Sequence, residues 1–241
     1  MQNINTLVLV AGKSSRIQEI SNGLPKPLIN INGKSCFERN LEWLVSHNIK
    51  NVWINKHYKP DLLEKAISSI DSIKIKSFYE HELLGTAGSA KKTYLLSKNT
   101  YHLLVIYGDN LYNFDLANFY ETHIKKKSLF TMAVYNIKEN LNSGIASGRV
   151  IEENGRIINF VESGDDNDST LVNAGVYLVS PMILDMIPER KYFDFAYNLF
   201  PLLLNNRYPI DCYKIDGYCL AIDTKESYLR TVKIIKNIEN I

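Results

Sequence analysis

The chain has 241 residues, of which 45% are hydrophobic and 22% are charged, and its formal net charge is +2. This composition is typical of a folded globular protein and argues against a disordered chain. Because 28 basic residues nearly balance 26 acidic ones, the overall charge gives no reason to bind nucleic acid or an anionic membrane. Any site for an anion must therefore be local.

The cysteines and the apolar runs bear on the compartment. Cys36, Cys212 and Cys219 lie far apart, without the paired spacing of a zinc site or the density of a disulfide scaffold. No apolar run approaches the roughly 18 residues of a membrane span, and the N-terminal stretch MQNINT lacks the basic region of a signal peptide. We therefore expect a cytoplasmic protein without a membrane partner.

Short apolar runs alternate with longer amphipathic runs in the first half of the chain. Strands are expected at residues 5–10, 51–56, 73–80 and 101–109, and helices at residues 36–49, 60–70 and 87–98. Alternation of this kind predicts a mostly parallel sheet that is covered by helices.

The second half of the chain is richer in strand-like runs separated by turn residues. Strands are expected at residues 129–137, 147–162 and 170–180, and helices at residues 181–186, 194–204 and 225–237. The pair Asn154 and Gly155 is a strong signal for a hairpin turn. Since no linker, repeat or low-complexity tract interrupts the chain, we predict one α/β domain over residues 1–241, with a β-rich insertion that carries part of the site.

The stretch VAGKSSR, residues 10–16, directly follows the first predicted strand. Ligands of open parallel sheets bind beyond the carboxyl ends of the strands, so this loop is the first candidate for a binding site. Gly12 permits close approach of the backbone, Ser14 and Ser15 add short donors, and Arg16 presents a fork that fits phosphate oxygens. The loop predicts a polyphosphate ligand, although taken alone it is equally compatible with a plain strand-to-helix turn.

The common phosphate-binding motifs do not fit this chain. The P-loop pattern GxxxxGK[ST] needs glycines where the sequence has Leu7 and Leu28, and the dinucleotide pattern GxGxxG is absent. A stronger signal is PKPL, residues 25–28, in which two prolines hold Lys26 in a stiff, extended segment. Stiffness limits the entropy lost in positioning an ammonium group, which indicates a functional lysine.

These two segments resemble those of the sugar-1-phosphate nucleotidyltransferases, also called sugar-nucleotide pyrophosphorylases. The signature of that family is an apolar strand, a loop A-G-x-G-[ST]-R and a P-K-P-L segment downstream; here Ser14 replaces the second glycine. Further motifs follow in the family's order, namely LLGTAGSA (83–90), VIYGDN (105–110), FVES (160–163) and VNAGVYLVSP (172–181). The LGTAG loop is similar to that of mannose and D-glycero-D-manno-heptose 1-phosphate guanylyltransferases.

The resemblance implies a Rossmann-like nucleotidyltransferase fold, in which a mostly parallel sheet flanked by helices carries a β-rich sugar-binding insertion. It implies Mg²⁺ as the cofactor, Asp109 and Asp223 as metal ligands, and Arg16 and Lys26 as catalytic residues. The nucleotide-binding residues that it implies are Ala11, Gly12, Lys13, Ser14, Ser15, Gly85, Thr86, Ala87, Gly88 and Gly108. The sugar-binding residues that it implies are Gly144, Glu162, Asn173 and Gly175.

Two positions depart from the family pattern. The family commonly has a lysine after the glutamate of its E-K-P segment, where it contacts the sugar phosphate, and this chain has Ser163. Near the C-terminus Ala221 stands where the second metal aspartate often lies, and we expect Asp223 to take that role. Without the family pattern, Asp109 is also compatible with a turn residue and Asp223 with a helix cap.

The leading hypothesis is an enzyme that transfers a nucleoside monophosphate from an NTP, with GTP favoured, to a hexose or heptose 1-phosphate. It would release pyrophosphate and form an NDP-sugar for surface glycan synthesis, and homodimers are common in the family. A second hypothesis, motivated by Ser163 and the AIDT segment, is a CTP-dependent enzyme acting on a choline-, polyol- or amino-type phosphate. A third is a non-catalytic nucleotide-sugar sensor, but a sensor has no leaving pyrophosphate for Arg16 and Lys26 to stabilise.

Overall fold

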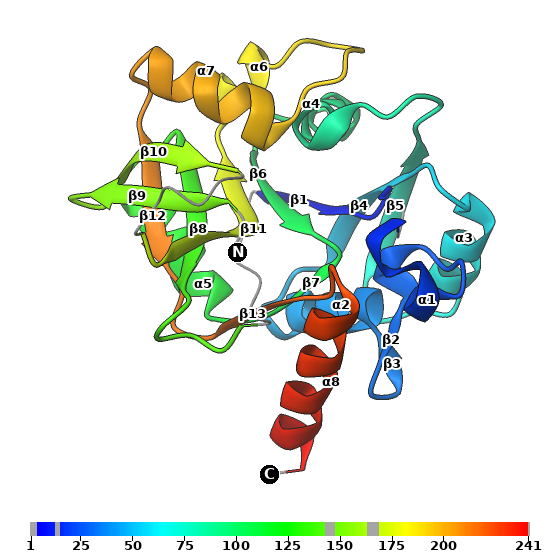
Figure 1. Cartoon of the computed structure of the whole chain (residues 1–241). Helices are drawn as coiled ribbons and strands as arrows, with labels where there is room; N and C mark the ends of the chain where they lie inside the picture. The colour runs from blue at the N-terminus through cyan, green and yellow to red at the C-terminus, as the bar shows by residue number, and fades with distance from the viewer. Residues whose placement is uncertain (1–3, 13–14, 143–147, 163–168, 241) are drawn as a thin grey trace.

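A computed structural model describes residues 4–12, 15–142, 148–162 and 169–240. Within these residues a nine-stranded sheet runs through the molecule with helices on both faces (Figure 1). From one edge to the other, its strands are β5 (Lys74–Tyr79), β4 (Asn51–Lys56), β1 (Ile4–Leu9), β6 (His102–Tyr107), β11 (Leu171–Val179), β8 (Phe130–Asn136), β12 (Ile210–Lys214), β10 (Arg156–Val161) and β9 (Arg149–Glu153).

The sheet is parallel in its N-terminal half and mixed in the remainder. Strands β5, β4, β1 and β6 pair in parallel, whereas β11 lies antiparallel between β6 and β8. β12 pairs in parallel with β8, and the antiparallel hairpin β9–β10 forms the far edge. This arrangement confirms the expected α/β class, with the strand-rich half where the sequence predicts it.

The register of β1 brings several loops to one edge of the sheet. Leu9, the last residue of β1, lies level with Asn55 of β4 on one side and with Tyr107 of β6 on the other. The segments that follow these strands therefore leave the sheet side by side, as the carboxyl ends of parallel strands must. This edge positions the candidate site.

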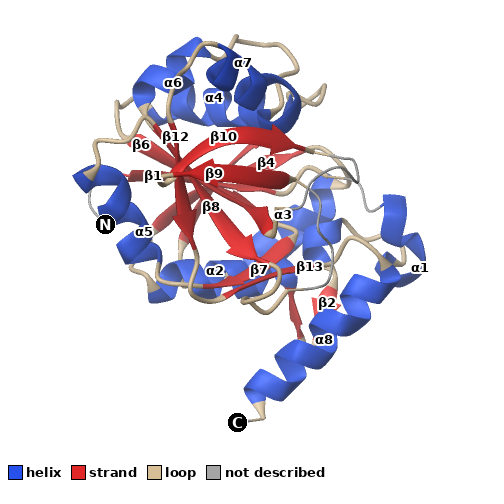
Figure 2. Ribbon diagram, turned by 60° about the vertical axis from the view of Figure 1, so that its left-hand side comes forward, coloured by secondary structure: helices blue, strands red, loops and turns tan. Residues whose placement is uncertain are grey.

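One face of the sheet is covered by α2 (Cys36–Ser46), α3 (Pro60–Ser68) and α5 (Leu116–Lys125), opposite the side that carries α4 (Figure 2). α2 begins after Ser35, whose side chain accepts a hydrogen bond from the Glu38 amide while the Glu38 carboxylate accepts one from the Ser35 amide. Apolar residues spaced along one side of α2 then face the sheet, where Phe37 and Leu44 are fully buried.

The other face is covered by α4 (Gly85–Ser97), α6 (Pro181–Met186), a π-helical turn η3 (Phe195–Leu199) and α7 (Phe200–Asn205). The large aromatic side chains fully buried on this side are Phe130, Tyr177, Phe195 and Phe200. Their ring centroids lie 4.8 to 6.0 Å apart, so they stabilise the layer through ring packing as well as through buried area.

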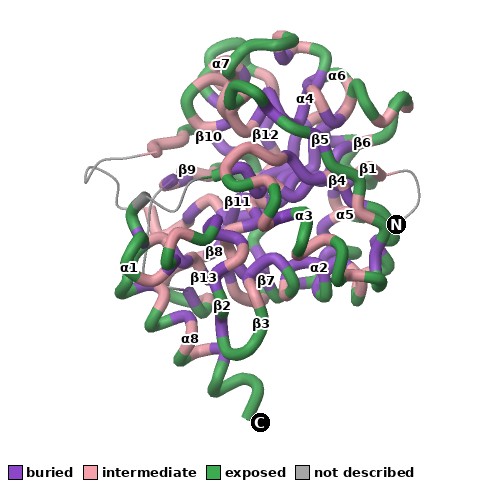
Figure 3. Tube along the Cα trace, turned by 90° about the vertical axis from the view of Figure 1, so that its right-hand side faces the viewer, coloured by how far each residue is buried: buried purple, intermediate pink, exposed green. Residues whose placement is uncertain are grey.

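Smaller strand pairs in the described part of the chain are β2 (Asn30–Ile31) with β3 (Lys34–Ser35), and β7 (Asn110–Asn113) with β13 (Tyr218–Ala221). After β13 comes α8 (Lys225–Glu239), and the short segments at the start of the chain are η1 (Ser15–Ile17), α1 (Gln18–Ser21) and η2 (Lys26–Leu28). α8 projects from the body of the molecule, and its C-terminal end is exposed (Figure 3).

Two details bear on the sequence predictions. Asn154 and Gly155 have φ angles of 51° and 77° and form the two-residue turn between β9 and β10, which confirms the expected hairpin. The helix expected at 194–204 instead divides into η3 and α7, with Pro201, which has no amide hydrogen, in the first turn of α7. None of the described helices is long and apolar enough to cross a membrane.

Candidate active site

A cavity of about 250 Å³ lies at the carboxyl ends of β1, β4 and β6. Of the residues predicted for the site, those that line it are Ala11, Gly12, Lys26, Gly85, Thr86 and Asp109. The loop after β1, the proline segment, the start of α4 and the end of β6 are therefore brought together, as the family resemblance implies for a nucleotide site.

Lys26 lies between two carboxylates at this cavity. Its Nζ donates a hydrogen bond of 2.7 Å to Asp109 Oδ2 and another to Asp223 Oδ1, and the residue is 8% exposed. Burial by itself lowers the pKa of Lys26, but the charges of Asp109 and Asp223 outweigh that effect and raise the pKa. Lys26 is therefore a protonated group whose charge is compensated on both sides.

The proline segment explains where Lys26 is held. Pro25 has an extended backbone, with φ −54° and ψ 140°, and the following residues form η2, which the Ile29 amide closes by donating to the Lys26 carbonyl. Pro27 is buried and has no amide hydrogen that would need a hydrogen-bond partner, so it fits this tight turn. The stiff segment expected from PKPL is thus a 3-10 turn rather than an extended stretch.

The pairing of β7 with β13 decides which C-terminal residue reaches Lys26. Asn110 lies opposite Ala221 in this antiparallel pair, so the backbone of Ala221 is part of the small sheet. Asp109 precedes β7 and Asp223 follows β13, and both leave the same end of the small sheet. The structure therefore brings Asp223, and not Ala221, to the lysine.

The helix-cap alternative for Asp223 is wrong. Thr224 holds that position at the start of α8, and its side chain accepts a hydrogen bond from the Ser227 amide. Asp223 is free to face Lys26, and the Arg16 guanidinium lies 4.0 Å from Asp223 Oδ1. The Arg16 side chain is itself 76% exposed, so this second contact is a loose one.

The loop after β1 is described in part. Lys13 and Ser14 lie outside the described residues, and only the backbone of Ser15, in η1, is described. Ala11 is buried, whereas Gly12 is exposed at the cavity, and a Cβ atom built on Gly12 would meet nothing within 4 Å. Packing against the described residues therefore does not require a glycine there, which leaves approach of a ligand as a reason for it.

Residues 83–90, which include the predicted nucleotide-binding residues Gly85 to Gly88 and are called the base loop, are held from behind by a distant segment. Gly85 has φ +73°, and a Cβ atom there would lie 2.6 Å from the Phe193 carbonyl oxygen. The Gly88 amide donates a hydrogen bond of 2.8 Å to that same oxygen, and the Phe193 amide donates one of 2.8 Å to the Leu84 carbonyl. A Cβ atom at Gly88 would lie 3.0 Å from the Lys191 carbonyl oxygen, so close contact between two backbones excludes a side chain at Gly85 and leaves little room for one at Gly88.

Two other predicted nucleotide-binding residues pack inside the protein. Ala87 is fully buried under the sheet. A Cβ atom at Gly108 would lie 2.7 Å from the Leu9 carbonyl oxygen, to which the Gly108 amide donates a hydrogen bond of 2.9 Å. Neither residue lines the cavity, so any effect they have on a ligand acts through the loops they support.

Asp194 is a site residue that the sequence analysis does not single out. Its Oδ2 accepts a hydrogen bond of 2.8 Å from Thr86 Oγ1, and its Oδ1 accepts from the amides of Ala196 and Tyr197 at the start of η3. Asp194 also lines the cavity. An acidic residue before a predicted helix signals only a cap, so its contact with the base loop could not be inferred.

A buried polar network under the base loop is also absent from the sequence prediction. Glu80 is 1% exposed, and its carboxylate accepts hydrogen bonds from Asn55 Nδ2, Ser89 Oγ and the Leu84 amide. The Asn55 side-chain oxygen in turn accepts one from the Val10 amide at 2.9 Å. These bonds tie β1, β4 and the start of α4 into one unit.

On the sugar side of the predicted site, Glu162 directly follows β10. Burial first, and then the charge of Asp194, raise the pKa of Glu162 to about 7, while Arg16 acts in the opposite direction. Gly144 and Ser163 lie outside the described residues. Glu162 is thus poised between its protonated and ionised forms near neutral pH.

Asn173 and Gly175 shape an irregular stretch of β11. Asn173 Nδ2 donates to the Tyr177 hydroxyl at 2.7 Å, and the Asn173 side-chain oxygen accepts from the Gly175 amide at 2.9 Å. Gly175 has φ +73°, and a Cβ atom there would lie 2.9 Å from the Tyr107 ring. The glycine is therefore required by the ring that packs against it.

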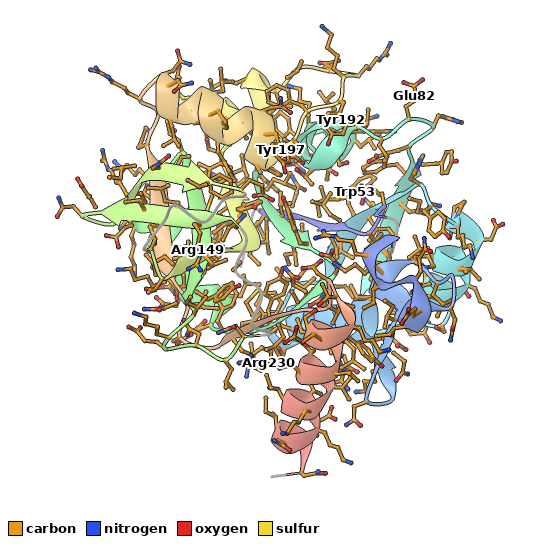
Figure 4. All side chains as sticks on the ribbon, in the orientation of Figure 1. Trp53, Glu82, Arg149, Tyr192, Tyr197 and Arg230 are labelled. Carbon is orange, nitrogen blue, oxygen red and sulfur yellow. The ribbon has the colours of Figure 1, made fainter. Side chains whose placement is uncertain are left out.

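Two exposed tyrosines flank Asp194 in the chain. Tyr192 lines the cavity and is 62% exposed, and Tyr197 in η3 is 65% exposed. Figure 4 shows both on the stretch that follows α6, on the side of the sheet that α4 covers.

The carboxylates of Asp109 and Asp223 fit a divalent metal. Both contact one cationic atom, Lys26 Nζ, so their oxygens converge on a single position. Mg²⁺ commonly takes one or two protein carboxylates and completes its shell with water and phosphate oxygens. Among the residues that the structure describes, no group of three or more His, Cys, Asp or Glu could hold a metal ion. The pair therefore fits a metal shared with a phosphate ligand.

The fold and this arrangement define an α/β nucleotidyltransferase, and the comparison with known families agrees. The chain belongs to the nucleotidyl transferase family, whose model matches residues 5–237. This confirms the family that the motifs predict.

Individual relatives are distant. The chain is 25% identical, over 99% of its length, to a UTP–glucose-1-phosphate uridylyltransferase from Synechocystis sp., of which it spans only 65%. It is 28% identical, over 80% of its length, to 81% of a D-glycero-alpha-D-manno-heptose 1-phosphate guanylyltransferase from Aneurinibacillus thermoaerophilus. HddC from Yersinia pseudotuberculosis, solved in complex with GMP-PN, has the same fold, with a TM-score of 0.81 and 21% identity over 96% of this chain and 99% of that one.

Proposed function

We propose that the protein transfers a nucleoside monophosphate from an NTP, with GTP favoured, to a hexose or heptose 1-phosphate. The observation that carries this proposal is Lys26 held between Asp109 and Asp223 at the edge of the sheet, beside an exposed glycine loop. In a chain of the nucleotidyl transferase family, this arrangement supports phosphoryl chemistry on an NTP. The product would be an NDP-sugar for surface glycan synthesis.

In the proposed reaction, an oxygen of the sugar phosphate attacks the α-phosphorus of the NTP. The new P–O bond forms as the bond between the α- and β-phosphates breaks, and pyrophosphate leaves. Both reactants are anionic, so the protein mainly has to neutralise charge and align them. Arg16 would hold the leaving pyrophosphate, Lys26 would hold the α-phosphate or the sugar phosphate, and the amides from Ala11 to Ser15 would line the triphosphate.

Mg²⁺ would be held by Asp109 and Asp223, and would supply further neutralisation of the phosphates. The loop from Gly85 to Gly88, supported by Gly108, would present backbone to the base. Glu162, Asn173, Gly175 and Gly144 would contact the sugar. The sugar contacts rest on the motif resemblance, since Glu162, Asn173 and Gly175 are not among the residues that line the cavity.

GTP is favoured because of two similarities. A relative that aligns with most of this chain is named a heptose 1-phosphate guanylyltransferase, and a structure of the same fold was solved with GMP-PN. Cytoplasmic location and a homodimer stay predictions; the free cysteines, Cys36, Cys212 and Cys219, are compatible with a reducing compartment.

A second candidate is CTP-dependent transfer to a non-sugar phosphate of the choline, polyol or amino type. The observation that favours it is Asp194, a carboxylate that lines the cavity together with the exposed ring of Tyr192 and whose charge also acts on Glu162. A carboxylate and an aromatic ring in one cavity are suited to the cationic group of a choline- or amino-type phosphate, which sugar and polyol phosphates lack.

Pyrophosphate release with Mg²⁺ separates these candidates. ATP, CTP, GTP, UTP and dTTP are each tested with mannose, glucose and heptose 1-phosphates and with choline, polyol and aminoalkyl phosphates. Release with GTP and a sugar 1-phosphate supports the main proposal, whereas release only with CTP and an alcohol phosphate supports the second. Absence of release from every pair contradicts both.

A further inference from the structure

Lys26 occupies the position between the two carboxylates that the proposed metal would use. Its Nζ is hydrogen-bonded to both Asp109 and Asp223, and its side chain is 10% exposed. The ammonium is therefore the cation that already compensates this pair. A second cation at the same oxygens has to share them with the lysine or displace it.

We infer that Lys26 and the divalent metal compete for the Asp109–Asp223 pair, and that nucleotide phosphates relieve the competition by drawing the ammonium away. This inference rests on the proposed function, which places metal and nucleotide at this site. The metal alone then binds weakly, and metal and nucleotide bind cooperatively.

Electrostatics supports the competition. Two carboxylates close together attract a divalent ion strongly, but an ammonium in contact with both cancels part of their charge and also repels the ion. The side chain of Lys26 is nine-tenths buried, where such interactions are screened less than at the surface. Removing this one positive charge therefore strengthens metal binding.

The structure also provides a place for the displaced ammonium. Lys26 and Gly12 line the same cavity, so a polyphosphate bound beside Gly12 would share that cavity with the lysine ammonium. The backbone of Lys26 lies in the turn η2, so the ammonium moves from the carboxylates to the phosphates by rotation of the side chain alone. Because coupling between two ligands is reciprocal, the metal also strengthens nucleotide binding.

Binding of Mn²⁺ alone, followed by its EPR signal, tests the inference without any catalysis. Lys26→Met and Lys26→Gln remove the charge, Lys26→Arg keeps it, and Lys34→Met removes one charge from a surface pair with Glu42 as a matched control. We expect the two neutral variants to bind Mn²⁺ about tenfold more tightly than the unaltered protein. Lys26→Arg and Lys34→Met should bind Mn²⁺ like the unaltered protein. Adding Asp109→Asn to a neutral variant should abolish its gain in Mn²⁺ affinity.

Adding a non-hydrolysable GTP analogue should remove most of the advantage of the neutral variants, because the phosphates then engage the lysine in the unaltered protein. Equal or weaker Mn²⁺ binding by both folded neutral variants, checked by circular dichroism, overturns the inference. An equal gain in Mn²⁺ affinity in Lys34→Met also overturns the inference, because the gain would then be an effect of the net charge of the protein. The pyrophosphate assay stands apart: turnover by the unaltered protein with no gain in Mn²⁺ affinity overturns this inference alone.

Discussion

Asn110 of β7 lies opposite Ala221 of β13, and this pairing makes Asp223 the partner of Lys26. Residue 221 belongs to a hydrogen-bonded ladder, whereas residue 223 lies beyond its end and is the last residue before the Thr224 cap of α8. The position of the C-terminal acid is thus set by the register of a small sheet.

The first prediction concerns this position. Asp223→Asn should lower the rate of pyrophosphate release roughly 100-fold, because it removes a charge from the proposed metal pair. Adding Ala221→Asp to that variant should not restore the rate, because Lys26 is hydrogen-bonded to residue 223, whereas residue 221 is paired with Asn110 in the small sheet. Recovery of activity in the double variant would contradict this account of the site.

The second prediction concerns Glu162, whose pKa is raised from 4.5 to about 7 by burial and by the charge of Asp194. Between these values the unfolded chain releases the proton that the folded protein keeps, so ionisation of Glu162 costs stability as the pH rises through this window. Glu162→Gln removes that cost. The melting temperature of this variant minus that of the unaltered protein should therefore increase from about pH 5 to pH 8.

Thermal melts of the two proteins across this pH range provide the measurement. Glu82→Gln, at an exposed glutamate that Figure 4 labels, serves as the control and should follow the unaltered protein at every pH. A constant difference between Glu162→Gln and the unaltered protein would show that the carboxyl does not titrate as described.

The third prediction concerns a histidine pair outside the site, of which His123 is fully buried. His102 Nδ1 and His123 Nε2 are 2.7 Å apart, and His123 Nδ1 lies 2.7 Å from Thr131 Oγ1. Burial, followed by the neighbouring His102, lowers the pKa of His123 from 6.5 to about 3. Below pH 6.5 His123 is protonated in the unfolded chain but stays neutral in the folded protein. The folded state therefore loses stability relative to the unfolded chain as the pH falls from 6.5 toward 3.

Urea unfolding at pH 7 and pH 5 measures this effect. The free energy of unfolding should decrease on acidification, and His123→Gln should show a smaller decrease even if it is less stable at both pH values. The same decrease in both proteins would assign the acid sensitivity to other groups.

The fourth prediction separates two costs of replacing a glycine. Gly85 and Gly33 have φ angles of +73° and +90°, but a Cβ atom would lie 2.6 Å from the Phe193 carbonyl oxygen at Gly85 and would meet nothing within 4 Å at Gly33. Gly33→Ala should cost roughly 1–2 kcal/mol for the left-handed backbone alone. Gly85→Ala should cost more and should also weaken nucleotide binding, because the start of α4 must move.

Denaturant unfolding and nucleotide titration of both variants check this prediction. If Gly85→Ala were no more costly than Gly33→Ala, the contact between the base loop and the 191–194 segment would be too loose to position a nucleotide.

The sequence carried the features that depend on neighbouring residues. Apolar periodicity marked the strands and helices, the Asn154 and Gly155 pair marked a hairpin, and the segments VAGKSSR and PKPL pointed to the family. Such signals are readable because turn geometry, caps and phosphate-binding loops each arise within a few consecutive residues. By contrast, β7 and β13 are short and carry no periodic pattern, so their pairing left no signal.

The tertiary structure alone decided which distant groups meet. Thr86 and Asp194 are 108 positions apart in the chain, and Lys26 and Asp223 are 197 apart, yet each pair is hydrogen-bonded. No local pattern encodes such contacts, because they follow from strand order and register across the whole sheet. The sequence by itself therefore determined the fold class and the family, whereas the packing of the folded chain determined that Asp223 contacts Lys26 and that Asp194 contacts Thr86.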